Sequence, residues 1–148
     1  MSTPTLRTII VFLLLAFALV SCKSTPPPAA KPAAAAVLQA IPAVDSTRYQ
    51  LPRDLNDWKN PYLVVRTDGV GLLDLPNNQI HIFDPDEIPD ALAKLPPEAW
   101  PYGRIVAIAE AAPSNDSEDE RTVIRKNRAI VAGTLQSMQV LIHWVPKT

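Results

Sequence analysis

The hydrophobic and polar positions divide the chain into three parts with different patterns. An uncharged apolar run covers Ile9–Val20, and a stretch rich in proline and alanine follows it over Ser24–Val44. Short apolar runs separated by turn residues then extend from Tyr62 to Val145. Only the third pattern is typical of a folded unit with its own core, so we expect one domain over residues 45–148.

The first half of this domain predicts two strands joined by a tight turn. Tyr62–Arg66 is rich in β-branched residues, and Val70–Leu75 follows it after the turn signal Asp68-Gly69. Gly71 lies inside the second strand, where a missing side chain indicates a bulge or a close approach of another backbone segment.

A short extended piece and a helix follow. Ile80–Phe83 is extended, and the helix has its cap near Asp86 and ends at the Pro96-Pro97 pair. Its apolar positions recur at helical spacing and form one face: Ile88, Ala91, Leu92 and Leu95.

The second half predicts a strand, a long helix and a last strand. Arg104–Ala109 is nearly all apolar, as in a covered central strand. Ser117 and Glu120 form a capping box that starts the helix, and Val140–Val145 is the last strand. The helix face that we expect to pack on the sheet comprises Val123, Asn127, Ile130, Val131, Thr134, Leu135 and Met138.

The resulting order is strand, strand, helix, strand, helix, strand. Because crossover connections are right-handed, the two strands that flank the long helix should be parallel. The sequence therefore predicts the α+β class, as a small two-layer sandwich with two helices on one face of a mixed sheet.

The N-terminal apolar run has the features of an export signal. Arg7 precedes it, and its 12 residues are fewer than the roughly 20 that a membrane span needs. The run ends at Leu19-Val20-Ser21-Cys22, which resembles the bacterial lipobox. The resemblance implies that residues 1–21 are a signal peptide and that Cys22 carries three acyl chains, palmitate among them. Several chains hold a protein firmly to a membrane, whereas one holds it weakly.

The residues after Cys22 predict the membrane in which the protein is located and a tether. Lys23 stands where an Asp would retain such a lipoprotein in the inner membrane, so we expect the outer membrane, with the domain facing the periplasm. We expect residues 22–44 to be the lipidated cysteine and a tether of up to ~65 Å. The alanine-rich run at residues 33–40 is too short to be a stable helix alone.

The amino-acid composition argues against several kinds of partner. Cys22 is the only cysteine, which excludes an internal disulfide. Residues 45–148 contain 11 Lys and Arg against 15 Asp and Glu, a net charge of −4. This balance argues against nucleic acid as a partner and against a domain that lies flat on anionic lipid.

The predicted element order from Tyr62 to Val145, with its Asp68-Gly69 turn, resembles the periplasmic domain of the ExbD/TolR family. Members of that family have an uncleaved membrane helix with a proton-coupling aspartate, whereas Ile9–Val20 has no charge. The resemblance therefore implies dimerisation or binding to envelope partners or peptidoglycan, and no energy transduction.

The OmpA-like peptidoglycan-binding domain is a rival resemblance through Arg128-Ala129. That family places aliphatic residues four and eight positions after the arginine, where this chain has Ala132 and Gln136. It also places an Asp just after the strand, where this chain has Glu110. We therefore expect no OmpA-like grip on diaminopimelate.

No catalytic constellation emerges from the residues. His81 and His143 each alternate with apolar residues, and no spacing supplies a carboxylate for a metal site. We expect no enzyme activity, metal or cofactor, and favour a lipoprotein whose domain binds an envelope protein. A peptidoglycan-binding module and an unrecognised envelope enzyme remain as alternatives. The candidate partner contacts are Arg121, Arg125, Arg128, Trp100 and Tyr102.

Overall fold

Strands and helices follow one another along the part of the chain that the computed structural model describes, which is residues 32–45, 47, 58–74, 77–113 and 117–145. The predicted signal peptide and Cys22 lie outside these residues. The elements are α1 (Pro32–Ala40), β1 (Tyr62–Arg66), β2 (Gly69–Asp74), β3 (Gln79–Phe83), α2 (Ile88–Ala93), the 3-10 turn η2 (Pro97–Ala99), β4 (Ile105–Glu110), α3 (Glu118–Ser137) and β5 (Leu141–Trp144).

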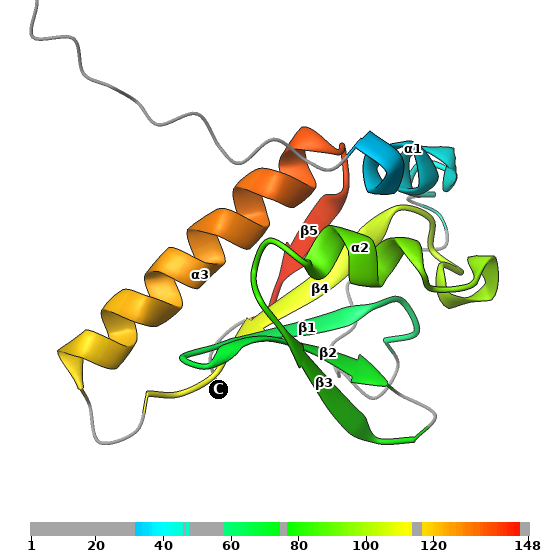
Figure 1. The fold of residues 1–148 in the computed structure, drawn as a ribbon. Helices are drawn as coiled ribbons and strands as arrows, with labels where there is room; N and C mark the ends of the chain where they lie inside the picture. Colours follow the sequence, from blue (N-terminus) through cyan, green and yellow to red (C-terminus); the bar gives the residue numbers. More distant parts are fainter. Residues whose placement is uncertain (1–31, 46, 48–57, 75–76, 114–116, 146–148) are drawn as a thin grey trace, which may run out of the picture.

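The strands form one mixed five-stranded sheet in the order β3-β2-β1-β4-β5 (Figure 1). β1, β2 and β3 make an antiparallel meander. β4 is parallel to β1, and β5 is parallel to β4 after the crossover through α3. The predicted α+β class and the parallel strand–helix–strand unit are therefore confirmed.

The helices gather on one side of the sheet (Figure 1). Alternate strand residues, among them Leu63, Val65 and Ile108, are fully buried beneath them in the main core. Burial of this many aliphatic side chains on one face is the main source of stability for a domain of this size. No helix among the described residues is both long and apolar enough to cross a membrane.

Two elements add to the predicted order. The short extended piece is a full strand, β3, because each of its residues pairs with one of β2. The additional helix is α1, which forms within the predicted tether. The sandwich therefore has five strands and helices α1, α2 and α3 on one face, where two helices were expected.

α1 packs into the domain core. Leu38 is fully buried and Ala34 nearly so, and α1 lies against α2. The Arg104 guanidinium donates a hydrogen bond to the Gln39 carbonyl at 3.0 Å. The described fold thus begins at Pro32, ahead of the predicted boundary at Asp45, because packing against α2 supplies the stability that a short helix lacks alone.

The chain after α1 is held by Gly103. This glycine has a φ of +82°, and a Cβ atom there would lie 2.5 Å from the Ala43 carbonyl oxygen. The Pro42 carbonyl accepts the backbone N–H of Arg104 at 2.9 Å. Only glycine allows this close approach, so the position fixes α1 to the start of β4.

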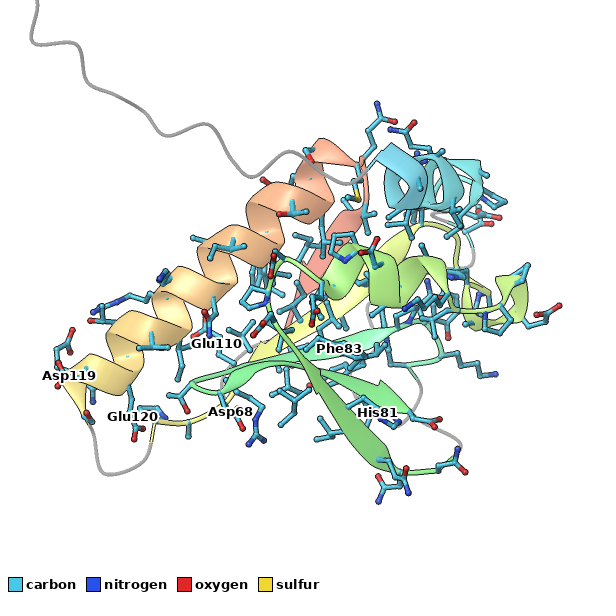
Figure 2. All side chains as sticks on the ribbon, viewed as in Figure 1. Asp68, His81, Phe83, Glu110, Asp119 and Glu120 are labelled. Carbon is cyan, nitrogen blue, oxygen red and sulfur yellow. The ribbon has the colours of Figure 1, made fainter. Side chains whose placement is uncertain are left out.

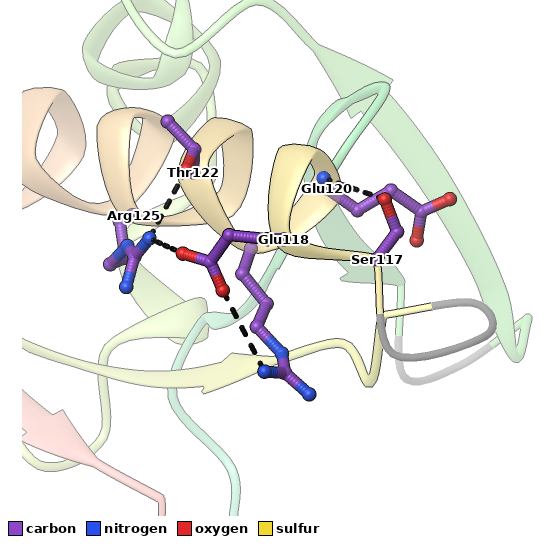
Figure 3. Close-up of polar contacts among 6 residues, drawn as sticks. Ser117, Glu118, Glu120, Thr122 and Arg125 are labelled. Carbon is purple, nitrogen blue, oxygen red and sulfur yellow. Dashed lines mark hydrogen bonds and ion pairs between the residues drawn. The ribbon is translucent and has the colours of Figure 1, made fainter.

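α3 begins as predicted. Ser117 Oγ accepts the backbone N–H of Glu120 at 3.4 Å (Figure 3). The buried face differs at one end, because Ile124 is buried while Val123 is 40% exposed. Asn127, Val131 and Thr134 continue the buried face, together with Leu135 and Met138. The prediction for Val123 is therefore wrong by one position, and Ile130, which was also predicted on this face, is only partly buried.

A smaller cluster covers the part of the opposite face that lies over β4. Trp58 is buried against Ile105 and Ala107 of β4. Asn60, which is also buried, donates to the carbonyls of Gly103 and Ile105 at 2.7 and 2.8 Å. Its side-chain oxygen accepts the Tyr102 N–H at 2.9 Å. This amide satisfies three backbone groups and ties the segment before β1 to the start of β4.

Candidate docking site at the edge of the sheet

The strand β3 is an exposed edge. Among the described residues it lies outermost in the sheet and pairs with β2 alone. Its sequence Gln-Ile-His-Ile-Phe contains no acid, lysine, arginine or proline, and four of its five residues are exposed. Proteins usually protect such edges with charges or proline, because unpaired backbone groups there attract another strand. β3 lacks both forms of protection.

Two isoleucines extend this edge onto the open face of the sheet, the face away from the helices. Ile80 and Ile82 are 45% and 46% exposed. A Cβ atom on Gly71 would lie 2.5 Å from Ile80 Cγ2. The close neighbour is thus a side chain, and the β1–β2 register is regular at Gly71, so the predicted bulge or close backbone approach is wrong. The missing side chain lets Ile80 lie flat across β2 and gives the open face an apolar border next to the edge.

A cavity of about 710 Å³ lies beside β3, and we call it the β3-side cavity. Its apolar walls include Leu72 of β2 and Leu95 after α2. His81 of β3 also lines it, as do the charged residues Lys59 and Glu98. Its size and its mainly apolar lining with a few polar groups are typical of a binding pocket.

Acidic residues gather at the ends of the edge. Asp74, at the end of β2, lines the β3-side cavity and accepts a hydrogen bond from the Asn77 amide at 2.8 Å. Exposed Asp84, Asp86 and Glu87 follow β3 directly. Figure 2 shows His81 and Phe83 on β3, which ends at this acidic turn. A ligand along β3 would therefore meet negative charge at either end.

A second groove lies between α1, α2 and η2. It has a volume of about 540 Å³, and its described lining is apolar, with Val37, Leu92 and Trp100 among its walls. Trp100 is buried, and its indole Nε1 has no hydrogen-bond partner in the structure. This nitrogen has almost no accessible surface, so a ligand in the groove would not reach it without a rearrangement.

The three candidate arginines do not form one site. Glu118 pairs with both Arg121 and Arg125, and all three are exposed (Figure 3). Arg128 instead lies 4.2 Å above the ring of Trp144 and donates to Glu110 at 2.6 Å. Arg128 therefore supports the packing of α3 on β4 and β5, while the other two stabilise the first turns of α3.

The two candidate aromatic residues also lie in different parts of the structure. Trp100 is a wall of the α1–α2 groove, as described above. Tyr102 is half-buried on the other face and meets the ring of Trp58 at a centroid distance of 5.7 Å. They do not line a common surface groove with the arginines, so the five candidates are not one contact surface.

The two histidines occupy opposite edges and opposite faces of the sheet. His81 shares the helix face with Leu72, its partner on β2, whereas His143 on β5 shares the open face with Ala107. His143 stacks on Trp58 with a ring separation of 5.6 Å, and burial lowers its pKa. Within the described residues, no three His, Cys, Asp or Glu side chains are grouped to hold a metal ion.

The sequence analysis missed the edge site. The pattern showed that His81 and Phe83 share a face, which leaves Ile80 and Ile82 on the other. Both faces of Ile80–Phe83 are therefore partly apolar, so alternation alone could not show which one is covered. The available signal was the absence of charge and proline along the strand, which indicates an unprotected edge only once its place in the sheet is known.

No protein-family model, no curated protein and no solved structure matches this chain in the comparisons made.

Proposed function

We propose that this protein is a non-catalytic lipoprotein of the cell envelope whose domain binds an envelope protein through the β3 edge. The lipobox-like Leu19-Val20-Ser21-Cys22 supports the membrane anchor. The anchor acts by holding the domain near one membrane surface, where even a modest affinity suffices for a stable complex.

The observation that carries the proposal is the unprotected strand β3. Its uncharged, exposed residues and the apolar border formed by Ile80 and Ile82 match the requirements for strand addition by a partner. In this mode, main-chain hydrogen bonds give affinity and alternate side chains give specificity. Isolated surface isoleucines need no explanation, but two on one uncharged edge strand do.

Photo-crosslinking in cells tests this proposal. A photoreactive amino acid replaces Ile82 in one strain and Val123 of α3 in another, because the two positions are similarly exposed, at 46% and 40%. We expect a discrete protein adduct from position 82 and none from position 123. Adding Ile80→Lys should abolish the adduct at 82, since it places a charge on the edge. The same adducts from both positions would contradict the proposal.

The second candidate function is peptidoglycan binding, which the ExbD/TolR resemblance implies. Purified sacculi should retain the full-length mature protein if this is its function, and Ile82→Lys should then have no effect. The first candidate expects no retention beyond that of an unrelated lipoprotein. Within the described residues, Arg128 and Glu110 already pair with each other, which favours the first candidate over OmpA-like wall binding.

A further inference from the structure

We propose that the partner of the β3 edge is an extended, positively charged protein segment that adds a strand to β3 and places one apolar side chain in the β3-side cavity. This inference rests on the proposed function and narrows the partner to a chemical class. Three observations carry it: the position of the cavity, the open-face isoleucines and the acids at either end of the edge.

The position of the cavity matches the side-chain alternation of an added strand. His81 and its cross-strand neighbour Leu72 both point to the helix face, and both line the β3-side cavity. In an antiparallel pair, the partner residue opposite His81 has its Cβ about 4.5–5.5 Å away and points to the same face. That residue therefore lies beside the cavity that His81, Leu72 and Leu95 line.

The next positions of an added strand face the other way. Residues before and after the cavity residue would point to the open face and lie beside Ile80 and Ile82. Both isoleucines are nearly half exposed, so apolar partner side chains there remove further apolar surface from water. The matching segment thus has three successive apolar residues, with the central one in the cavity.

The negative charge around the edge favours basic residues at both ends of this partner segment. Asp74 and Glu98 lie at the cavity, and Asp84, Asp86 and Glu87 lie beyond the end of β3. Lys59 is the only lysine or arginine among the described residues that line the cavity. Lysine or arginine on both sides of the apolar residues would complement this potential and speed the encounter.

A second copy of this chain fits the edge poorly. An antiparallel pair centred on His81 would place Asp84 of one copy opposite Asn78 of the other. Asn78 follows Asn77, which already holds Asp74. The acidic ends of the two copies would therefore approach each other, and β3 has no lysine or arginine that could offset their charge.

A synthetic peptide tests the inference. The probe is fluorescein-labelled Lys-Lys-Thr-Val-Leu-Val-Thr-Lys-Lys, and its matched control has glutamate in place of each lysine. Fluorescence anisotropy measures binding to the full-length mature protein in detergent micelles. We expect the basic probe to bind at least about tenfold more tightly than the acidic one, with an affinity that falls as salt is added.

Variants of the probe and of the protein test the cavity contact and the charge contact separately. Replacing the central leucine of the probe by alanine should weaken binding about tenfold, since the apolar side chain that fills the cavity would be lost. Glu98→Lys should weaken binding of the basic probe several-fold. Asp119→Lys, which changes an exposed acid on α3, should leave it unchanged.

Four results would overturn the inference. The first is equal affinity for basic and acidic probes, and the second is no loss on the leucine-to-alanine change. The third is the absence of probe binding by a protein that forms dimers sensitive to Ile82→Lys, because a second copy would then occupy the edge. If no probe binds while the crosslink at position 82 in cells persists, this inference fails and the proposed function stands.

Discussion

At the scale of single residues, Arg128 and Arg125 show how similar side chains on one helix take different roles. Arg128 stacks on Trp144 and pairs with Glu110, whose side chain is only 11% exposed. Arg125 contacts Glu118 and Thr122 at the exposed start of α3. Sequence spacing placed both off the buried face and could not separate them, because the partners of Arg128 come from β4 and β5.

Truncating these two arginines should therefore have different effects. Arg128→Ala removes a cation–π contact and leaves the mostly buried Glu110 without this ion pair, so we expect a loss of about 1–2 kcal/mol in the free energy of unfolding. Arg125→Ala removes only exposed contacts and should change stability by less than about 0.5 kcal/mol. Urea unfolding of both variants provides the measurement, and equal losses would refute the structural role of Arg128.

His143 should make the stability of the domain depend on pH. Burial lowers the pKa of this histidine in the folded state, so the unfolded chain binds the proton first as pH falls. The free energy of unfolding therefore decreases as pH drops through the range between the ordinary histidine pKa and the lower folded value. His143→Phe keeps an aromatic ring against Trp58 but has no group that binds a proton.

Urea unfolding at a series of pH values checks this expectation. As the pH falls from 8 to 5, the free energy of unfolding of the parent protein should decrease more than that of His143→Phe. Because all other titrating groups are shared, the difference isolates His143. A constant difference over this range would show that the histidine does not contribute.

At the scale of the elements, the predicted periodicity located β1, β2, β4 and β5 and both α2 and α3, but it marked β3 only as a short extended piece. Helical spacing identified most of the α3 face from Asn127 onward, with Ile130 only partly buried, but it could not choose between Val123 and Ile124 in the first turns. Both are β-branched and adjacent, and the choice depends on the angle at which the helix crosses the sheet. That angle is a property of the packed structure.

The first turns of α3 provide a matched pair for testing that face. Ile124→Asp buries an unpaired carboxylate and should cost several kcal/mol, a large part of the ~5–15 kcal/mol of a small domain. Val123→Asp places the same group on a side chain that is 40% exposed and should cost less than about 1 kcal/mol. Thermal unfolding would contradict the structure if Val123→Asp were the more damaging change.

α1 is the element that the sequence could least predict. Nine residues rich in alanine have little helical stability alone, so local propensity indicated a tether. The decisive contacts are distant in sequence: Leu38 meets the core, and Gln39 accepts a hydrogen bond from Arg104. Such contacts leave no local signature.

Two soluble fragments measure the contribution of α1. Residues 32–148 include it, whereas residues 45–148 match the boundary predicted from sequence. We expect both to fold but the shorter one to be less stable by about 2–4 kcal/mol, since it loses the buried Leu38 and exposes apolar surface of α2. Identical urea midpoints for the two fragments would show that α1 contributes nothing to the fold.

At the scale of the whole molecule, the membrane anchor rests on the sequence, because Cys22 lies outside the described residues. Cys22→Ser should leave an uncleaved precursor without lipid, since the lipobox cysteine is the acylation site that the resemblance implies. Mass spectrometry and detergent partitioning of the variant give the readout. Maturation at the normal mass would refute the lipoprotein proposal.

The docked helix α1 also limits how far the domain can move from the bilayer. Nine residues, 23–31, separate Cys22 from Pro32, and even a fully extended chain of that length spans at most about 32 Å. The predicted tether of residues 22–44 would have reached about twice as far. On the proposed lipidation, the β3 edge therefore samples only a thin layer above the membrane. A partner strand must be presented within that layer, which favours membrane-bound proteins over those that diffuse through the rest of the compartment.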